Sequence, residues 1–296
     1  MKRYPIVAAV ALAVALFSVT VASGQAPPGP VTRYTTRFTA VTSPAPQFEI
    51  VQQVAEYAPG AGTAFHSHGG PAFVTVIEGE LTFRESGKAG VVVKAGETFS
   101  ELPTQSIDVS NSSSARARMV AAFLLPAGAA LTTLQPGVIP PSVGPKVLGL
   151  TRGQVTSPAA SFDVVQLVFD FAPGSFGAVH KHGGPGQATV FEGVVTKREG
   201  AQVTAYPAGQ GFPEVPDAVL SVGNLSATPA SMAVAFLLPA GAVLTTPVNA
   251  PGPPATGTGT ADQAGAWQSP GLLAVTLLGV TLLAGAAAVA ARRSRR

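Results

Sequence analysis

The sequence predicts an all-β protein with two similar domains, placed between an N-terminal secretory signal and a C-terminal transmembrane helix. Three observations lead to this expectation. The body of the chain contains an internal sequence repeat. Short β-branched or aromatic runs alternate there with Gly, Pro or Asn. Both ends of the chain are apolar and carry positive charges.

The internal repeat is the strongest of these signals. A shift of 114 residues aligns the octet AFHSHGGP at 64–71 with AVHKHGGP at 178–185. A shift of 113 residues aligns FLLPAGAALTT at 123–133 with FLLPAGAVLTT at 236–246. Two copies of one sequence predict two equivalent folded units.

We expect the first unit to cover residues 31–134 and the second to cover residues 146–248, with a Pro/Gly-rich linker between them. Within a unit, runs such as 48–54 and 73–77 have the composition of β-strands. No stretch of the body keeps the apolar period of a helix without meeting Gly or Pro. The pattern is typical of a β-sandwich or β-barrel.

Residues 1–26 have the pattern of a secretory signal peptide. Lys2 and Arg3 precede the apolar run 6–21, and small residues follow at 22–24 and at 26. We expect cleavage within 22–26. The alternative is an uncleaved N-terminal anchor.

The C-terminal end predicts a membrane anchor. Residues 271–291 are uncharged and mostly apolar, and at about 1.5 Å per residue they would cross a hydrocarbon core of about 30 Å. The Arg-rich tail 292–296 then belongs on the cytoplasmic side. Residues 249–270 form a Pro/Gly/Thr-rich stalk that is not expected to fold. The body would therefore lie outside the cytoplasm on a single-pass membrane protein.

The stalk contains PPATG (Pro253–Gly257), which resembles the LPxTG signal of sortase substrates with Pro253 in place of Leu. This similarity makes a sortase a candidate processing partner.

Charge and cysteine content exclude several classes of function. Six of the 18 basic residues lie at the two ends, which leaves 12 basic against 15 acidic side chains in the body. With no basic block there, nucleic acid is not an expected partner. The chain has no Cys, so disulfides, zinc–thiolate sites and thiol catalysis are excluded.

All four histidines of the chain lie in the two repeated octets, as His66, His68, His180 and His182. Alternate side chains of a strand project from the same face, so each pair can chelate one divalent metal ion. The alternative is that the pairs form hydrogen bonds in a polar pocket without metal. A Ser-His-Asp site is not expected, because the histidines are paired with each other.

These octets lie in longer stretches that resemble a known family. Residues 59–81 resemble the first cupin motif and residues 95–111 resemble the second, and both recur at 173–195 and 208–224. The resemblance covers nearly all of 31–246. It implies a bicupin, with two tandem jelly-roll barrels and a site in the mouth of each.

The chain departs from the metal-binding members of that family, which usually supply three His and one Glu. Ala72 and Gly186 occupy the Glu position, and Ile107 and Leu220 occupy the position of the third His. We expect Ile107 and Leu220 to line the two cavities, to make them drier, and to favour an apolar or aromatic ligand.

Few other ligand-type side chains lie near these positions. Glu101 and Glu214 recur in both units. Gln187 stands next to the vacant Glu position in the second unit alone, and we expect it to line the cavity of that unit. Two His and one Glu would hold iron, manganese, nickel or zinc, with iron and manganese favoured. Alternatively, the two Glu satisfy backbone donors beside Pro103 and Pro216.

Three functions remain open at this point. The leading interpretation is a membrane-anchored module that binds a small molecule, such as a sugar or an aromatic compound, through a divalent metal held by the paired His. The second is a metal-dependent cupin enzyme, either a ring-cleaving dioxygenase of the quercetinase type or a sugar isomerase. The third is a structural surface protein without catalysis.

Overall fold

A computed structural model describes residues 28–248 of the chain. These residues form 20 β-strands and no helix, which confirms the all-β prediction for this part of the chain. The predicted signal (1–26) and the stalk, span and tail (249–296) lie outside the described residues. Between residues 28 and 248, no helix has the length and apolar character needed to cross a membrane.

Ten strands come from each half of the described chain. The first ten are β1 (Val31–Thr42), β2 (Gln47–Tyr57), β3 (His66–Ser67), β4 (Ala72–Glu78), β5 (Glu80–Glu85), β6 (Val91–Lys94), β7 (Thr98–Glu101), β8 (Ile107–Ser110), β9 (Ala117–Pro126) and β10 (Thr133–Leu134). The other ten are β11 (Lys146–Thr156), β12 (Ser161–Phe171), β13 (His180–His182), β14 (Gly186–Glu192), β15 (Val194–Glu199), β16 (Gln202–Pro207), β17 (Gly211–Glu214), β18 (Leu220–Gly223), β19 (Ala230–Pro239) and β20 (Thr245–Pro247).

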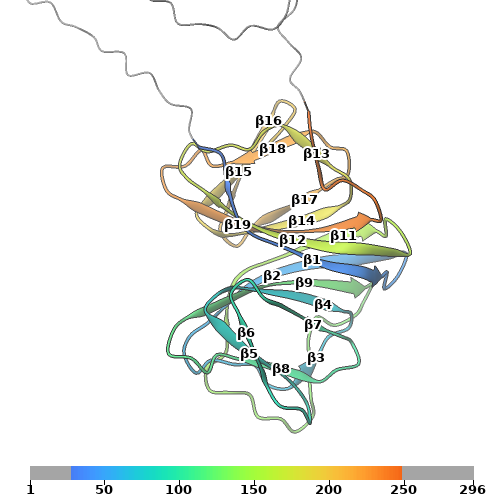
Figure 1. Cartoon of the computed structure of the whole chain (residues 1–296), viewed down its shortest axis with the longest axis vertical. Helices are drawn as coiled ribbons and strands as arrows, with labels where there is room; N and C mark the ends of the chain where they lie inside the picture. The colour runs from blue at the N-terminus through green and yellow to red at the C-terminus, as the bar shows by residue number, and fades with distance from the viewer. Residues whose placement is uncertain (1–27, 249–296) are drawn as a thin grey trace, which may run out of the picture. The chain divides into compact units, whose positions relative to one another are not determined.

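The strands form four five-stranded sheets, two in each of two jelly-roll barrels. The first barrel has the orders β11-β2-β9-β4-β7 and β10-β3-β8-β5-β6. The second barrel has the orders β1-β12-β19-β14-β17 and β16-β15-β18-β13-β20. The sheets that contain β2 and β12 face each other in the middle of Figure 1, and the two His-bearing sheets lie on the outside.

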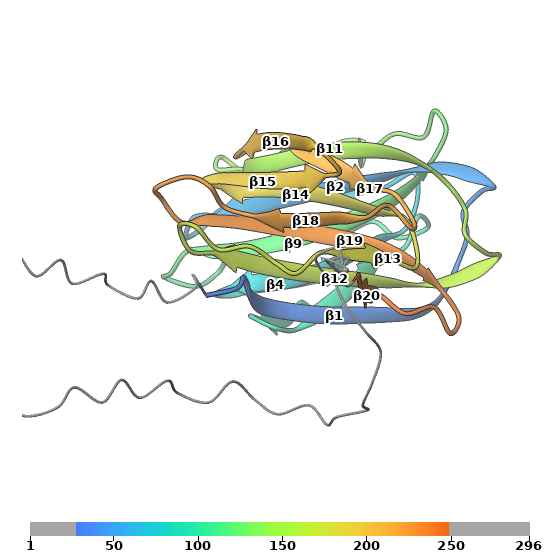
Figure 2. The same ribbon diagram turned by 90° about the horizontal axis from the view of Figure 1, so that it is seen from above.

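In each barrel, the edge strand of the sheet that faces the other barrel comes from the other sequence unit. β1 pairs with β12 and β11 pairs with β2, both antiparallel, and β1 can be followed beside β12 in Figure 2. Arg37 on β1 contacts Asp163 at 2.7 Å, and Arg152 on β11 contacts Glu49 at 2.7 Å. Neither of the predicted units, 31–134 or 146–248, is therefore a complete barrel by itself.

Strand β2 is buried on both faces. Val51 and Tyr57 point into the core of the first barrel, whereas Phe48 and Ile50 point toward the second barrel. The ring of Phe48 stacks on that of Phe162, with centroids 6.1 Å apart. This double burial explains why β2 is apolar on both of its alternating faces.

The Gly-Gly-Pro that follows each His pair is required by a close backbone contact. A Cβ atom on Gly70 would lie 1.9 Å from the carbonyl oxygen of Leu124, and one on Gly184 would lie 2.0 Å from that of Leu237. Only glycine fits there, because neither carbonyl can move without breaking its strand. The turn thereby fixes the His pair against the β4–β9 or β14–β19 ladder.

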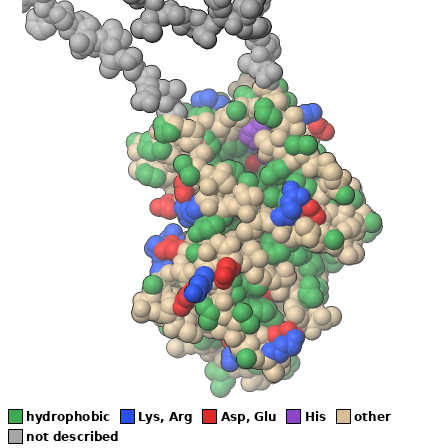
Figure 3. Space-filling view, in the orientation of Figure 1, with side chains coloured by type: hydrophobic (Ala, Val, Ile, Leu, Met, Phe, Trp, Pro, Cys, Tyr) green, Lys and Arg blue, Asp and Glu red, His purple; other side chains and the backbone are tan. Residues whose placement is uncertain are grey.

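The surface carries charges of both signs side by side. In Figure 3, Lys and Arg side chains lie next to Asp and Glu on the visible face, without a field of one sign. Several of these contacts are ion pairs, such as Arg116–Glu78 at 2.7 Å and Arg84–Asp108 at 2.7 Å. Such a face has no electrostatic preference for a polyanion.

Candidate metal sites

The two His pairs lie in equivalent positions of the two barrels. His66 begins β3 and His68 follows it, and each side chain is 6% exposed. His180 and His182 lie on β13. The ring centroids of a pair are 4.8 Å apart in the first barrel and 4.7 Å apart in the second, and the rings meet edge to face in both.

Backbone carbonyls fix the tautomer of the first pair. The Nδ1–H of His66 donates to the carbonyl oxygen of Ala64 at 2.7 Å, and the Nδ1–H of His68 donates to that of Leu131. A carbonyl oxygen can only accept a hydrogen bond, so each Nδ1 carries the proton. Each neutral ring therefore presents the lone pair of Nε2, which is the arrangement of a metal-binding histidine.

The second pair repeats this arrangement. The Nδ1–H of His180 donates to the carbonyl oxygen of Ala178 at 2.7 Å, and that of His182 donates to Leu244 at 2.8 Å. The two Nε2 atoms lie 3.0 Å apart. Both lone pairs are thus held toward the same point.

A buried glutamate approaches each pair. Oε2 of Glu101 lies 2.8 Å from Nε2 of His68, and Oε2 of Glu214 lies 2.7 Å from Nε2 of His182. Both Glu residues are 3% exposed. In the second barrel, ligand atoms of His180, His182 and Glu214 all lie within 4.8 Å of one another.

These atoms are all hydrogen-bond acceptors when the rings are neutral, so they repel one another unless a proton or a cation lies among them. With neutral rings, the buried Nε2 of His68 and the buried Oε2 of Glu214 each face another acceptor and receive no hydrogen bond within residues 28–248. Two nitrogens at about 2.1 Å from one ion, at right angles, would be about 3.0 Å apart. The 3.0 Å between the Nε2 atoms of His180 and His182 therefore fits a shared divalent metal ion.

A proton is the competing occupant in the first barrel. Burial lowers the pKa of His68, but the hydrogen bond and the charge of Glu101 outweigh it and raise the pKa overall. Burial, as the largest effect, lowers the pKa of His66. His66 is thus held neutral beside a His68–Glu101 pair that can share either a proton or a metal ion.

Comparison with known proteins identifies the first unit. Residues 53–123 match the family described as Cupin domain. The chain contains a cupin domain. The second barrel repeats the sequence and the strand order of this cupin unit.

Several solved structures are similar to the chain at low sequence identity, and no curated protein matches it. The oxalate decarboxylase–formate complex of Lactobacillus farciminis is 12% identical, with a TM-score of 0.46, over 72% of this chain and 88% of that chain. The Bacillus subtilis oxalate decarboxylase at pH 4.6 is 11% identical, with a TM-score of 0.44, over 72% and 77%. A cupin 2 conserved barrel protein of Leptotrichia buccalis is 10% identical, with a TM-score of 0.34, over 71% and 97%.

The two Glu residues occupy equivalent positions in the two barrels. Glu101 is the ladder partner of Ala72, and Glu214 is the ladder partner of Gly186. Ala72 and Gly186 stand at the positions where the family resemblance expects Glu. Residues directly opposite each other in antiparallel strands have Cβ atoms about 4.5–5.5 Å apart. A carboxylate is therefore present in each barrel, but it comes from the neighbouring strand.

Ile107 and Leu220 lie in the hydrophobic cores of the two barrels rather than on the cavity walls, contrary to expectation. Ile107 is the ladder partner of His66 and Leu220 that of His180, and both are 1% exposed. Beside the His pairs, the walls include residues two positions further along these strands, Val109 and Val222. Sequence spacing correctly places Ile107 and Leu220 inside the barrels, but it cannot give their depth.

Gln187 does not belong to the second cavity, again contrary to expectation. Its Nε2 donates to Oγ1 of Thr151 at 3.0 Å, and its Oε1 lies against Gly153 on the exchanged strand β11. Successive side chains of a strand point to opposite faces. Position 186 faces the ring of Phe236, so the amide of Gln187 points out of the barrel.

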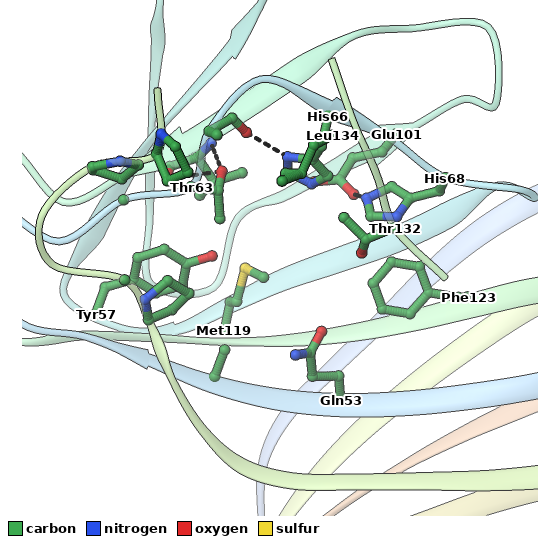
Figure 4. A pocket seen from close by; sticks show the side chains of 18 residues that line it. Gln53, Tyr57, Thr63, His66, His68, Glu101, Met119, Phe123, Thr132 and Leu134 are labelled. Carbon is green, nitrogen blue, oxygen red and sulfur yellow. Dashed lines mark hydrogen bonds and ion pairs between the residues drawn. The ribbon is translucent and has the colours of Figure 1, made fainter. Parts of the chain in front are cut away.

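A cavity adjoins each candidate site. The first has a volume of about 320 Å³ and is lined by His66, His68 and Glu101 (Figure 4). The second has a volume of about 290 Å³ and is lined by His180 and His182 together with Glu214. Histidine side chains are visible at the surface of the second barrel in Figure 3.

Some residues that line the cavities were not predicted from the sequence. Thr32 of the exchanged strand β1 lines the second cavity, and Pro140 of the linker lines the first. No sequence signal identifies these two, because their place depends on which barrel the exchanged strand joins. The inward residues of β2 and β12 also line the cavities, and their alternation along each strand could have revealed them.

Proposed function

We propose that each cupin barrel binds a divalent metal ion through its two His and its Glu, and that a small molecule binds in the adjoining cavity. One observation carries this proposal for the second barrel: ligand atoms of His180, His182 and Glu214 converge within 4.8 Å, and both rings present Nε2 because Nδ1 is engaged elsewhere. The first barrel is included because it repeats the Nδ1 hydrogen bonds and the contact between a His and a buried Glu, although its three ligand atoms do not meet the same distance. Two nitrogen ligands and one carboxylate favour manganese or iron, with nickel and zinc as alternatives.

The groups around the proposed metal ion would have different roles. The backbone carbonyls orient the imidazoles, and the carboxylate offsets part of the charge of the ion. A metal held by three protein ligands keeps coordination positions open, and it would supply a positive charge toward the cavity. A small molecule with an electron-rich group can then bind in the cavity beside it.

Metal analysis of the full-length chain tests this function. The chain is stripped with a chelator, dialysed against manganese, iron, nickel or zinc near neutral pH, and analysed by mass spectrometry for bound metal. We expect two ions per chain, and one ion after either His66→Ala with His68→Ala or His180→Ala with His182→Ala. A chain that takes up none of the four metals would refute the proposal.

A matched control lies between the two ligands of the second barrel. Lys181 shares β13 with His180 and His182, but its Nζ contacts Asp217 at 2.9 Å on the outside of the barrel. Lys181→Ala should therefore retain both ions. Loss of metal in this variant would indicate that the strand, rather than the imidazoles, is responsible.

The location of this activity belongs to the same proposal. The apolar segments 6–21 and 271–291 and the Arg-rich tail 292–296 support a body anchored outside the cytoplasm by one C-terminal span. The PPATG segment at 253–257 supports a sortase as processing partner. Ligands available at the cell surface are then the relevant ones.

A metal-dependent enzyme is the second candidate. Two His and one carboxylate with open positions is the ligand set of non-haem iron oxygenases, and the cavity lies beside that set in each barrel. Oxygen consumption by the iron-loaded chain with catechol would support a dioxygenase, and interconversion of an aldose and a ketose would support an isomerase. Metal binding without either reaction would leave the binding function in place.

A further inference from the structure

The two cavities differ at three equivalent positions on one wall. In each barrel, this wall is the inner face of the strand next to the exchanged strand. In the first cavity, the three positions hold Gln53, Ala55 and Tyr57. In the second cavity, they hold Leu167, Phe169 and Phe171.

The strand register shows that these positions correspond. Ala55 is the ladder partner of Met119, and Phe169 is the ladder partner of Met232. Both Met residues line their own cavities. The wall therefore has the same backbone in both barrels, and only the side chains differ.

The wall of the first cavity offers hydrogen-bonding groups without partners. Within residues 28–248 the amide of Gln53 and the hydroxyl of Tyr57 form no side-chain hydrogen bond with the protein, and both groups line the cavity. Figure 4 shows both groups pointing into the cavity that His66 and His68 border. Burial, and then the charge of Glu101, raise the pKa of Tyr57, so its hydroxyl keeps its proton.

A ligand that displaces water from these two groups loses free energy unless it replaces the hydrogen bonds of that water. Gln53 and Tyr57 therefore favour a ligand that can exchange hydrogen bonds with an amide and a phenol. Ala55 between them leaves space for such a ligand. The first cavity thus suits a polar molecule, for example one with several hydroxyl groups.

The wall of the second cavity is apolar and aromatic. The rings of Phe169 and Phe171 have centroids 6.1 Å apart and are tilted by 47°. Phe236 closes the space beside His182, with ring centroids 4.2 Å apart. A polar molecule would lose its hydrogen bonds to water against this wall and gain none in return.

The size of this second cavity admits an aromatic ring. An apolar cavity of about 150 Å³ is large enough for benzene, and the second cavity measures about 290 Å³. Aromatic ligands can also make edge-to-face contacts with Phe169 and Phe171.

We infer that the two barrels bind different ligands, a polar molecule in the first and an aromatic molecule in the second, and that the three wall positions determine this difference. The inference deepens the proposed function, since it treats the same two cavities as binding sites. It does not require a metal ion, because the wall acts through hydrogen bonds and apolar contacts alone.

Indole is a suitable probe, because it is aromatic, uncharged and soluble in water. Equilibrium dialysis of radiolabelled indole against the full-length chain should give one site per chain. Exchanging the second wall for the first, by Leu167→Gln, Phe169→Ala and Phe171→Tyr, should weaken binding at this site by about tenfold or more.

The reverse exchange provides a gain of binding, which misfolding cannot mimic. With Gln53→Leu, Ala55→Phe and Tyr57→Phe, the chain should bind two indole molecules. Two equal sites in the unaltered chain, no site at all, or unchanged stoichiometry in both variants would overturn the inference. Metal content measured on the same samples distinguishes the metal-binding proposal from the inference about the cavity walls. If the chain takes up no metal but shows the expected indole stoichiometry, only the metal-binding proposal is refuted.

Discussion

Glu101 lies directly across the β4–β7 ladder from Ala72, and the second barrel repeats this relationship with Glu214 and Gly186. The carboxylate that the family resemblance expects on one strand is supplied by its neighbour. The small residue opposite leaves room for the Glu side chain inside the barrel. The vacant position and the relocated Glu are therefore two parts of one arrangement.

This arrangement predicts that a Glu at position 72 can replace the carboxylate of Glu101. In a chain whose second site is removed by His180→Ala and His182→Ala, Glu101→Ala should weaken manganese binding by at least the roughly 10–100-fold that loss of a supporting group costs. Adding Ala72→Glu should recover most of the affinity, because opposed side chains reach the same space. Calorimetric titration with manganese measures both effects. A double variant that folds but binds no better than Glu101→Ala alone would contradict the prediction.

The glycine after the His pair should be indispensable for stability. Gly70→Ala would place a Cβ atom 1.9 Å from the carbonyl oxygen of Leu124, so we expect a loss of about 2 kcal/mol or more in the free energy of unfolding. Gly144→Ala is the control, since no atom lies within 4 Å of its added Cβ, and it should change stability by less than about 0.5 kcal/mol. Chemical denaturation of the two variants provides the comparison, and equal losses would show that the contact is unimportant.

The strand exchange predicts how the body can be divided. The fragment 31–134 lacks β11 and leaves the edge of β2 unpaired, whereas the fragment 47–156 contains every strand of the first barrel. We expect 47–156 to be the more soluble fragment and to unfold at a higher temperature, because an open apolar edge promotes aggregation. Circular dichroism and thermal melting of both fragments test this. A stable, monomeric 31–134 would mean that the exchange is dispensable.

The predicted membrane topology can be tested on intact cells. If the body lies outside the cytoplasm, added protease should cut the stalk at 249–270 and release a fragment that contains both barrels. An antibody against the tail 292–296 should detect its epitope only after the cells are made permeable. A protected body with an accessible tail would reverse the predicted orientation.

Much of the fold could be predicted from the sequence, because the repeat and the turn residues are local signals. The pairing of His66 with His68 followed from the two-residue period of a strand, and Glu101 could be selected because it recurs as Glu214. Gln187 was expected in the second cavity because it stands next to the vacant Glu position, but a shift of one residue along a strand reverses the direction of the side chain. The strand exchange could not be predicted, because the sequence of β1 shows that it is a strand but not which barrel it joins.

The exchange of β1 and β11 also determines whether the formation of each barrel depends on protein concentration. If the two units were separate chains, each barrel would need a strand from another molecule, and its stability would depend on protein concentration. The linker between β10 and β11 makes this association intramolecular, at an effective concentration in the millimolar range that is typical of short linkers. Dilution therefore cannot separate the two barrels, and a single chain keeps both of its cavities complete.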